Sequence, residues 1–173
     1  MNSILKSMVV VALVAVASLA AAAEPTLKAD LKSVVETGQV APVEGLTTAG
    51  QPDAAALRVF AEQGYVAVID LRTEGEDRGL DEAAVVSGLG MEYVNLPITG
   101  DDITFAKADE LADLLSQYEG PVLLHCGSAN RVGALLALDK VAKGMDAETA
   151  IEEGRLAGLS SLEGKVRAAI DAK

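Results

Sequence analysis

Hydrophobic positions along this chain change spacing repeatedly, from the short continuous or alternating runs typical of strands to the three-to-four-residue spacing typical of helices. Strands are predicted over 46–49, 66–71, 92–96 and 121–125. Helices are predicted over 53–63, 81–89, 104–118, 130–143, 146–153 and 161–172. The last strand is apolar on both faces, so we expect it at the centre of the sheet. The pattern predicts an α/β fold with a mainly parallel central sheet of about four to five strands and helices on both faces.

The first 23 residues have the pattern of a secretory signal peptide. Lys6 precedes an apolar run from Met8 to Ala23, which ends in small residues suited to cleavage. The run is shorter than the roughly 20 residues of a spanning helix, so a signal is favoured, with a membrane anchor as the alternative. We expect a periplasmic or secreted protein, without a stable membrane anchor after cleavage. Residues 24–45 form a lead-in with a short helix at 27–36, and residues 46–173 form one domain.

The net charge limits the partners of this protein. The whole chain carries a charge of −12, and removing residues 1–23 removes only one basic residue, Lys6, which brings the charge to −13. Such a surface is poorly suited to nucleic acid or to an anionic membrane, so no nucleic-acid partner is expected. A small anionic substrate would have to be bound by local geometry.

The only cysteine, Cys126, follows the only histidine, His125, at the end of the apolar strand 121–125. In open α/β sheets, ligands bind at the carboxyl ends of the strands. An unpaired thiol is prone to oxidation in an oxidising compartment unless it is buried or has a function that needs it. The neighbouring residues favour a functional thiol, because a loop of small residues leads to Arg131 and into an apolar helix.

This strand–loop–helix can activate a thiolate and bind an oxyanion. A helix N-terminus and a nearby guanidinium both lower the pKa of a thiol. Cys126 is therefore the predicted nucleophile, and it would form a covalent intermediate. Arg131 is predicted to hold two oxygens with its planar fork, and successive backbone N–H groups can form an anion nest. The predicted substrate-binding residues are Gly127, Ser128, Ala129 and Asn130.

If the bound anion is a phosphomonoester, its hydrolysis needs a general acid in addition to the nucleophile. Asp101 and Asp102 lie in the segment before the helix at 104–118 and are the candidates, with Asp101 preferred. The alternative is that one of them only favours the start of that helix, where acidic residues interact well with the helix dipole.

Two further residues are predicted to support the site without contacting the substrate. His125 is expected to orient the loop through hydrogen bonds, the alternative being a satisfied core histidine. Arg72 follows the strand 66–71 and is expected either to form a structural ion pair with Glu76 or to shape the mouth of the pocket. One histidine and one cysteine are too few for a typical zinc site, so neither a metal nor a cofactor is expected.

Several blocks in a fixed order resemble one bacterial family. The blocks are Ala49-Gly50-Gln51-Pro52, Val68-Ile69-Asp70-Leu71-Arg72 with Glu76, Tyr93-Val94-Asn95-Leu96-Pro97, Gly120 to Cys126, and Gly154 to Leu159. Together they are similar to the beta-lactamase-hydrolase-like, phosphatase-like domains, which are related in fold to dual-specificity phosphatases. The resemblance covers roughly 43–160 and implies a phosphatase-like fold with a cysteine nucleophile.

The length of the loop between Cys126 and Arg131 is compatible with more than one reaction. Cysteine-dependent phosphatases place five residues between cysteine and arginine, whereas four separate Cys126 from Arg131. The leading hypothesis is hydrolysis of a phosphomonoester through a phosphocysteine. The alternative is rhodanese-like sulfur transfer with a persulfide on Cys126. A third hypothesis, a non-catalytic anion- or partner-binding relic, rests on Val132, where phosphatases usually carry Ser or Thr.

Overall fold

Four parallel strands form the central sheet of the computed structural model, which describes residues 26–40 and 46–173. The strands are β1 (Leu46–Ala49), β2 (Ala67–Asp70), β3 (Glu92–Asn95) and β4 (Val122–His125). Their spatial order is β1-β4-β2-β3, and every neighbouring pair is parallel. The predicted fold class is confirmed, and the doubly apolar strand β4 lies inside the sheet, between β1 and β2. The predicted signal peptide lies outside the described residues.

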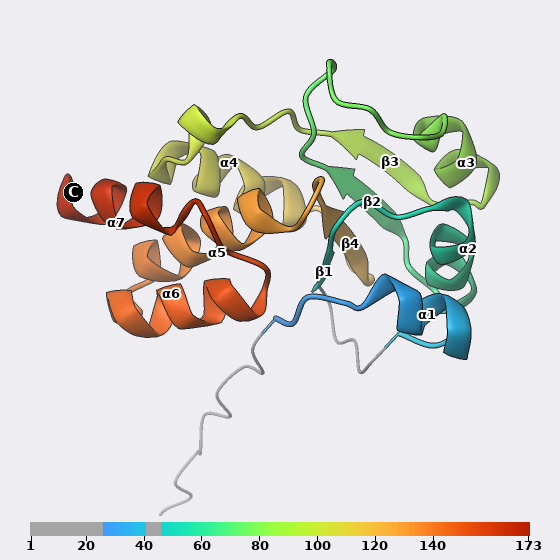
Figure 1. The fold of residues 1–173 in the computed structure, drawn as a ribbon, viewed down its shortest axis with the longest axis horizontal. Helices are drawn as coiled ribbons and strands as arrows, with labels where there is room; N and C mark the ends of the chain where they lie inside the picture. Colours follow the sequence, from blue (N-terminus) through green and yellow to red (C-terminus); the bar gives the residue numbers. More distant parts are fainter. Residues whose placement is uncertain (1–25, 41–45) are drawn as a thin grey trace, which may run out of the picture.

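Helices cover both faces of this sheet (Figure 1). One face carries α1 (Leu31–Thr37), α2 (Ala54–Glu62) and α3 (Glu82–Gly88). The other face carries α4 (Phe105–Leu115), α5 (Asn130–Ala142), α6 (Ala147–Leu156) and α7 (Glu163–Asp171). A short 3₁₀ turn, η1 (Gly100–Asp102), precedes α4. Within the described residues, no helix combines the length and apolar character needed to cross a membrane.

Strand side chains alternate between two hydrophobic cores, because successive residues of a strand point to opposite faces. Ile69 and Leu124 pack into the core under α4 to α7. Val68 and Leu123 pack into the core under α1 to α3. The lead-in contributes to the second core, since Val34 of α1 is buried there. These apolar faces hold β4, and therefore the residues that follow it, in a fixed place.

Helix α5 packs against α6 with almost no side chain between the two backbones. A Cβ atom added to Gly133 would collide with the backbone of Gly154 and Leu159. A Cβ atom added to Gly154 would lie 2.8 Å from the carbonyl oxygen of Gly133. Only glycine permits this approach, so these two positions set where α5 lies and hence where the loop before it ends.

Gly133→Ala should therefore destabilise the protein by at least about 2 kcal/mol, since overpacking against backbone forces the helices apart. The matched control is Gly164→Ala, in α7, where an added Cβ meets nothing within 4 Å. That substitution should be neutral or stabilising by up to about 1 kcal/mol. Urea unfolding of both variants checks the comparison, and equal stability would contradict the assigned role of Gly133.

Candidate active site

Cys126 begins the loop at the carboxyl end of β4, and its side chain is buried. The backbone of the loop is held from two sides. The Gln51 N–H donates to the carbonyl of Gly127 at 3.2 Å, and Lys28 Nζ donates to the carbonyl of Ser128 at 3.1 Å. The second contact brings the lead-in beside the loop, next to the backbone bridge between Lys28 and Thr48.

The loop turns into α5 through a left-handed residue. Ala129 has φ +71°, and it is the only non-glycine residue with positive φ among those described. This conformation costs an L-residue about 1–2 kcal/mol. Gly158, with φ +117°, packs directly on Ala129, and a Cβ atom there would lie 2.9 Å from the Ala129 carbonyl oxygen. The tight turn lets a four-residue spacing bring Arg131 back toward the thiol.

Arg131 forms a bidentate ion pair with Glu76. Its Nη1 and Nη2 donate to Glu76 Oε1 and Oε2, each at 2.6 Å, and Nη1 also donates to the carbonyl of Ile98 at 2.9 Å. The hydrogen bonds from Arg131 hold the pKa of Glu76 down at about 2, although burial opposes the shift. The pKa of Arg131 is raised, first by Glu76 and further by the nearby Cys126 thiol. The guanidinium is therefore held by Glu76 beside the loop that begins with the predicted nucleophile.

The Arg131–Glu76 pair corrects the expected partner of Glu76 and limits which donors Arg131 can offer to an oxyanion. Of the two alternatives expected for Arg72, the ion pair with Glu76 is wrong: the partner of Glu76 is Arg131, which lies 55 positions away in the sequence. The two terminal nitrogens of Arg131 are occupied by Glu76 in this structure. Nε–H and the second hydrogen of Nη2 are the donors that these contacts leave for an oxyanion.

Asn130 and the small residues of the loop have separate roles. The Asn130 side chain is occupied: its amide nitrogen donates to Ser161 Oγ at 2.7 Å, and its oxygen accepts from the Ser160 N–H at 2.8 Å. It thus ties the start of α5 to the segment after α6. Of the other three predicted substrate-binding residues, Gly127 and Ser128 are exposed and Ala129 is buried. Apart from the Ser128 hydroxyl, any contact from this stretch to an anion comes from backbone N–H groups.

A buried network of charges lies beside the end of β4. Asp70, the last residue of β2, accepts hydrogen bonds from Arg72 Nε at 2.9 Å, Arg78 Nε at 3.1 Å and the Tyr93 hydroxyl at 2.8 Å. Burial alone would raise the pKa of Asp70, but the hydrogen bonds from Arg72 outweigh it and lower that pKa. The side chain of Arg72 is completely buried and also pairs with Glu82. Arg72 therefore lies in the interior, away from a pocket mouth.

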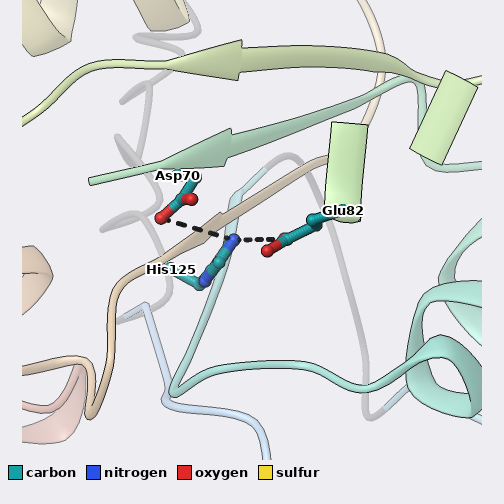
Figure 2. A group of neighbouring side chains, drawn as sticks. All are labelled: Asp70, Glu82 and His125. Carbon is teal, nitrogen blue, oxygen red and sulfur yellow. Dashed lines mark ion pairs between the residues drawn. The ribbon is translucent and has the colours of Figure 1, made fainter. Parts of the chain in front are cut away.

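His125 joins this network from β4 (Figure 2). Its Nε2 lies 2.7 Å from Glu82 Oε1 and 3.9 Å from Asp70 Oδ1, and all three side chains are buried. Asp70 and Glu82 were not singled out from the sequence. A charged residue at the end of an otherwise apolar strand was the signal for Asp70, whereas Glu82 resembles any acidic residue in the first turn of a helix.

The ligand atoms of Asp70, Glu82 and His125 all lie within 4.8 Å of one another, close enough to surround a metal ion. The guanidinium of Arg72 is already bonded to both carboxylates. Together with Arg78, which also pairs with Asp70, Arg72 thus neutralises the charge that would attract a divalent ion, and the three ligands could hold one only if Arg72 withdrew.

The two predicted general acids lie in and around η1. Asp102 accepts from the backbone N–H of Thr99 at 2.8 Å and from its hydroxyl at 2.6 Å, which lowers the pKa of Asp102. The Asp101 side chain is 93% exposed and pairs with Lys165 of α7 at 2.5 Å. Helix α4 is capped by Thr104 rather than by either aspartate. The carbonyl of Ile98, just before this turn, binds Arg131, so the turn borders the loop.

Comparison with known proteins places this architecture among phosphatase-like domains. Residues 30–143 match the family model described as beta-lactamase hydrolase-like protein, phosphatase-like domain. A beta-lactamase hydrolase-like protein from Agrobacterium fabrum is 32% identical over 114 residues, which is 64% of this chain but only 26% of the relative. The chain therefore spans about a quarter of the length of that curated relative.

Solved structures show the same fold at lower identity. A proposed phosphatase from Neisseria meningitidis superposes with a TM-score of 0.66 at 24% identity, over 76% of this chain and 95% of that one. A cysteine-to-serine variant of P. aeruginosa TpbA, crystallised with pTyr, gives a TM-score of 0.56 at 19% identity, over 79% and 93% of the two chains. At these identities the likeness establishes the fold alone.

Glu76→Gln should remove half of the bidentate pairing and loosen Arg131. Because the side chain of Glu76 is a third exposed, the expected loss of stability at neutral pH is about 1 kcal/mol. The folded-state pKa of about 2 lies below the unfolded value of about 4.3. The stabilisation is therefore fully present above about pH 5 and should disappear as the pH falls from about 4 to 2.

Urea unfolding at pH 7 and at pH 2–3 measures this difference. Glu74→Gln is the matched control, since Glu74 is an exposed residue of the same loop. A Glu76→Gln variant that unfolds like the control at pH 7 would contradict the importance of the pair.

Proposed function

Because the chain belongs to the beta-lactamase hydrolase-like, phosphatase-like domain family, we propose that it is an exported hydrolase that cleaves a phosphomonoester through a phosphocysteine. The observation that carries the proposal is the placement of Cys126 at the carboxyl end of β4, in the loop that leads into α5, with the guanidinium of Arg131 beside that loop. Export is supported by the apolar segment Met8–Ala23. The fold and family are compatible with hydrolase chemistry.

In the proposed reaction, the Cys126 thiolate attacks phosphorus and the bond to the leaving oxygen breaks. Backbone N–H groups from Gly127 to Asn130, together with the unused donors of Arg131, stabilise the equatorial oxygens. Glu76 holds the guanidinium in place so that it needs no reorganisation during the reaction. Water then attacks the phosphocysteine, which releases phosphate and restores the thiolate.

The proposed general acid is Asp101. Asp102 is committed to the Thr99 cap, whereas Asp101 has a single partner, Lys165, at the surface. An incoming substrate could draw Asp101 away from that exposed pair at little cost, because exposed ion pairs contribute only about 0–1 kcal/mol. The acid would then deliver its proton to the leaving oxygen.

The proposed substrate is a small phosphorylated molecule. A structural neighbour was crystallised with pTyr, which is a precedent for such a ligand on this fold. The net charge of −12 disfavours nucleic acid. Because the matched relatives are about four times longer than the shared region, the activities of those whole proteins are not carried over to this chain.

Sulfur transfer is the second candidate function, and two observations favour it. Four residues separate Cys126 from Arg131, and Val132, the residue after Arg131, is fully buried and offers no hydroxyl to help expel a thiolate. In that reaction Cys126 takes a sulfane sulfur from a donor and passes it to a thiol or cyanide. No general acid is required.

The mass of the covalent adduct on Cys126 decides between the two reactions. Rapid quenching of the purified protein with a phosphomonoester should trap a phosphoryl adduct, and quenching with thiosulfate should trap none. Because Cys126 is the only cysteine, every thiol adduct is assigned without ambiguity. Cys126→Ser should abolish turnover by several orders of magnitude. Unchanged turnover in that variant would refute both reactions proposed for Cys126.

Asp101→Asn should lower kcat about 100-fold for an alkyl phosphate, whose leaving oxygen needs a proton. It should change kcat little for an activated aryl phosphate, whose leaving group departs as the anion. Asp102→Asn is the matched control and should lower stability through the lost Thr99 cap without this dependence on the leaving group. The same leaving-group dependence in Asp102→Asn, but not in Asp101→Asn, would reverse the assignment.

A further inference from the structure

Glu82 is a buried carboxylate that the reaction described above does not use. It is the first residue of α3, and its side chain is inaccessible to solvent. One oxygen, Oε2, pairs with the guanidinium of Arg72. The other, Oε1, lies 2.7 Å from His125 Nε2, directly before the nucleophile Cys126. A buried carboxylate without such partners would be costly, so these two contacts account for its presence.

The contact with His125 determines where the imidazole carries its hydrogen. The two atoms are 2.7 Å apart and buried, yet they are not aligned as a regular hydrogen bond, and neither has a hydrogen-bond partner among the described residues. A carboxylate oxygen and a bare ring nitrogen would repel each other at this distance, and a carboxylate can only accept, so the hydrogen is assigned to Nε2. His125 Nδ1 is buried and has no partner in the described part of the chain. In this tautomer it presents a lone pair rather than an N–H.

We propose that Glu82 is a positioning residue that holds His125 as the Nε2–H tautomer and thereby fixes the start of the Cys126 loop. Arg72 completes the arrangement from the other side: it binds Glu82 and Asp70 together and prevents either carboxylate from turning away. The catalytic part of this inference rests on the proposed function, whereas the tautomer can be tested without it.

Glu82→Gln gives a specific outcome because Arg72 can only donate hydrogen bonds. The amide oxygen of the new side chain must face Arg72, which leaves its NH₂ group facing His125 Nε2. That nitrogen must then accept, so the hydrogen moves to Nδ1. The substitution keeps the shape of the side chain while it inverts the tautomer of the histidine.

His125 is the only histidine, so a long-range ¹H–¹⁵N spectrum of untagged, histidine-labelled protein reports one imidazole. The wild type should show the Nε2–H tautomer at neutral pH, and Glu82→Gln should show Nδ1–H. In phosphomonoester hydrolysis, kcat should fall about 10-fold to 100-fold, the range for residues that orient metal-bound histidines. KM should stay within about twofold, because the oxyanion donors remain.

Asp81→Ala is the matched control. Asp81 caps the same helix by accepting from the Ala84 N–H at 3.1 Å, and it is exposed. Its loss should lower Tm but leave the tautomer and kcat unchanged. An Nδ1–H or doubly protonated ring in the wild type, an unchanged tautomer in Glu82→Gln, or equal kcat losses in the two variants would each overturn the inference.

Two complications leave the inference testable. If Glu82→Gln does not fold, the wild-type spectrum still decides the tautomer, and Glu82→Asp, which retracts the carboxylate by one methylene, replaces it in the kinetic comparison. If the wild type hydrolyses no phosphomonoester, the proposed function fails, and the alkylation rate of the single thiol takes the place of kcat. An alkylation rate in Glu82→Gln equal to that of the wild type would then refute the positioning role.

Discussion

The buried guanidinium of Arg72 is the interaction on which much of this structure depends. A guanidinium stays charged in proteins, and taking it out of water costs several kcal/mol unless the charge is paired and hydrogen-bonded. Asp70 from β2 and Glu82 from α3 supply that pairing, and both also approach His125 at the end of β4. The buried charge of Arg72 thus links α3, on one face of the sheet, to the two central strands, β2 and β4. Loss of either partner would leave the buried guanidinium with a single carboxylate.

The thiol itself is held by a second set of constraints on the opposite side of the sheet. Close packing of Gly133 against Gly154 fixes α5 relative to α6, and Gly158 packs on Ala129 where the loop turns left-handed. Arg131 lies in the first turn of α5 and is bound by Glu76, which lies in the loop after β2. The thiol of Cys126, the guanidinium of Arg131 and the backbone amides of the loop therefore depend on elements from both faces. Such a site is rigid before any substrate arrives, which is what electrostatic stabilisation of a transition state requires.

The fixed geometry around Cys126 is compatible with both reactions proposed for it. Both reactions need a cation and N–H donors beside the thiol, whether the group transferred is phosphoryl or sulfur. The general acid separates the two reactions, and the structure makes Asp102 part of a cap while Asp101 remains in an exposed pair. In a chain with a net charge of −12, attraction of an anion must come from this short-range set of donors.

The order of strands and helices, the central place of β4 and the position of Cys126 at its carboxyl end could all be predicted from the sequence. Those features follow from the spacing of apolar residues, which acts over a few neighbouring positions. The sequence could not determine that Glu76 binds Arg131, or that Arg72 and Glu82 meet under His125. The first pair spans 55 positions and forms because β2 lies beside β4 in the sheet order β1-β4-β2-β3. Several carboxylates, among them Glu74, Glu76 and Asp77, lie close to Arg72 in the sequence with equivalent chemistry, so these partners follow only from the packing of distant segments.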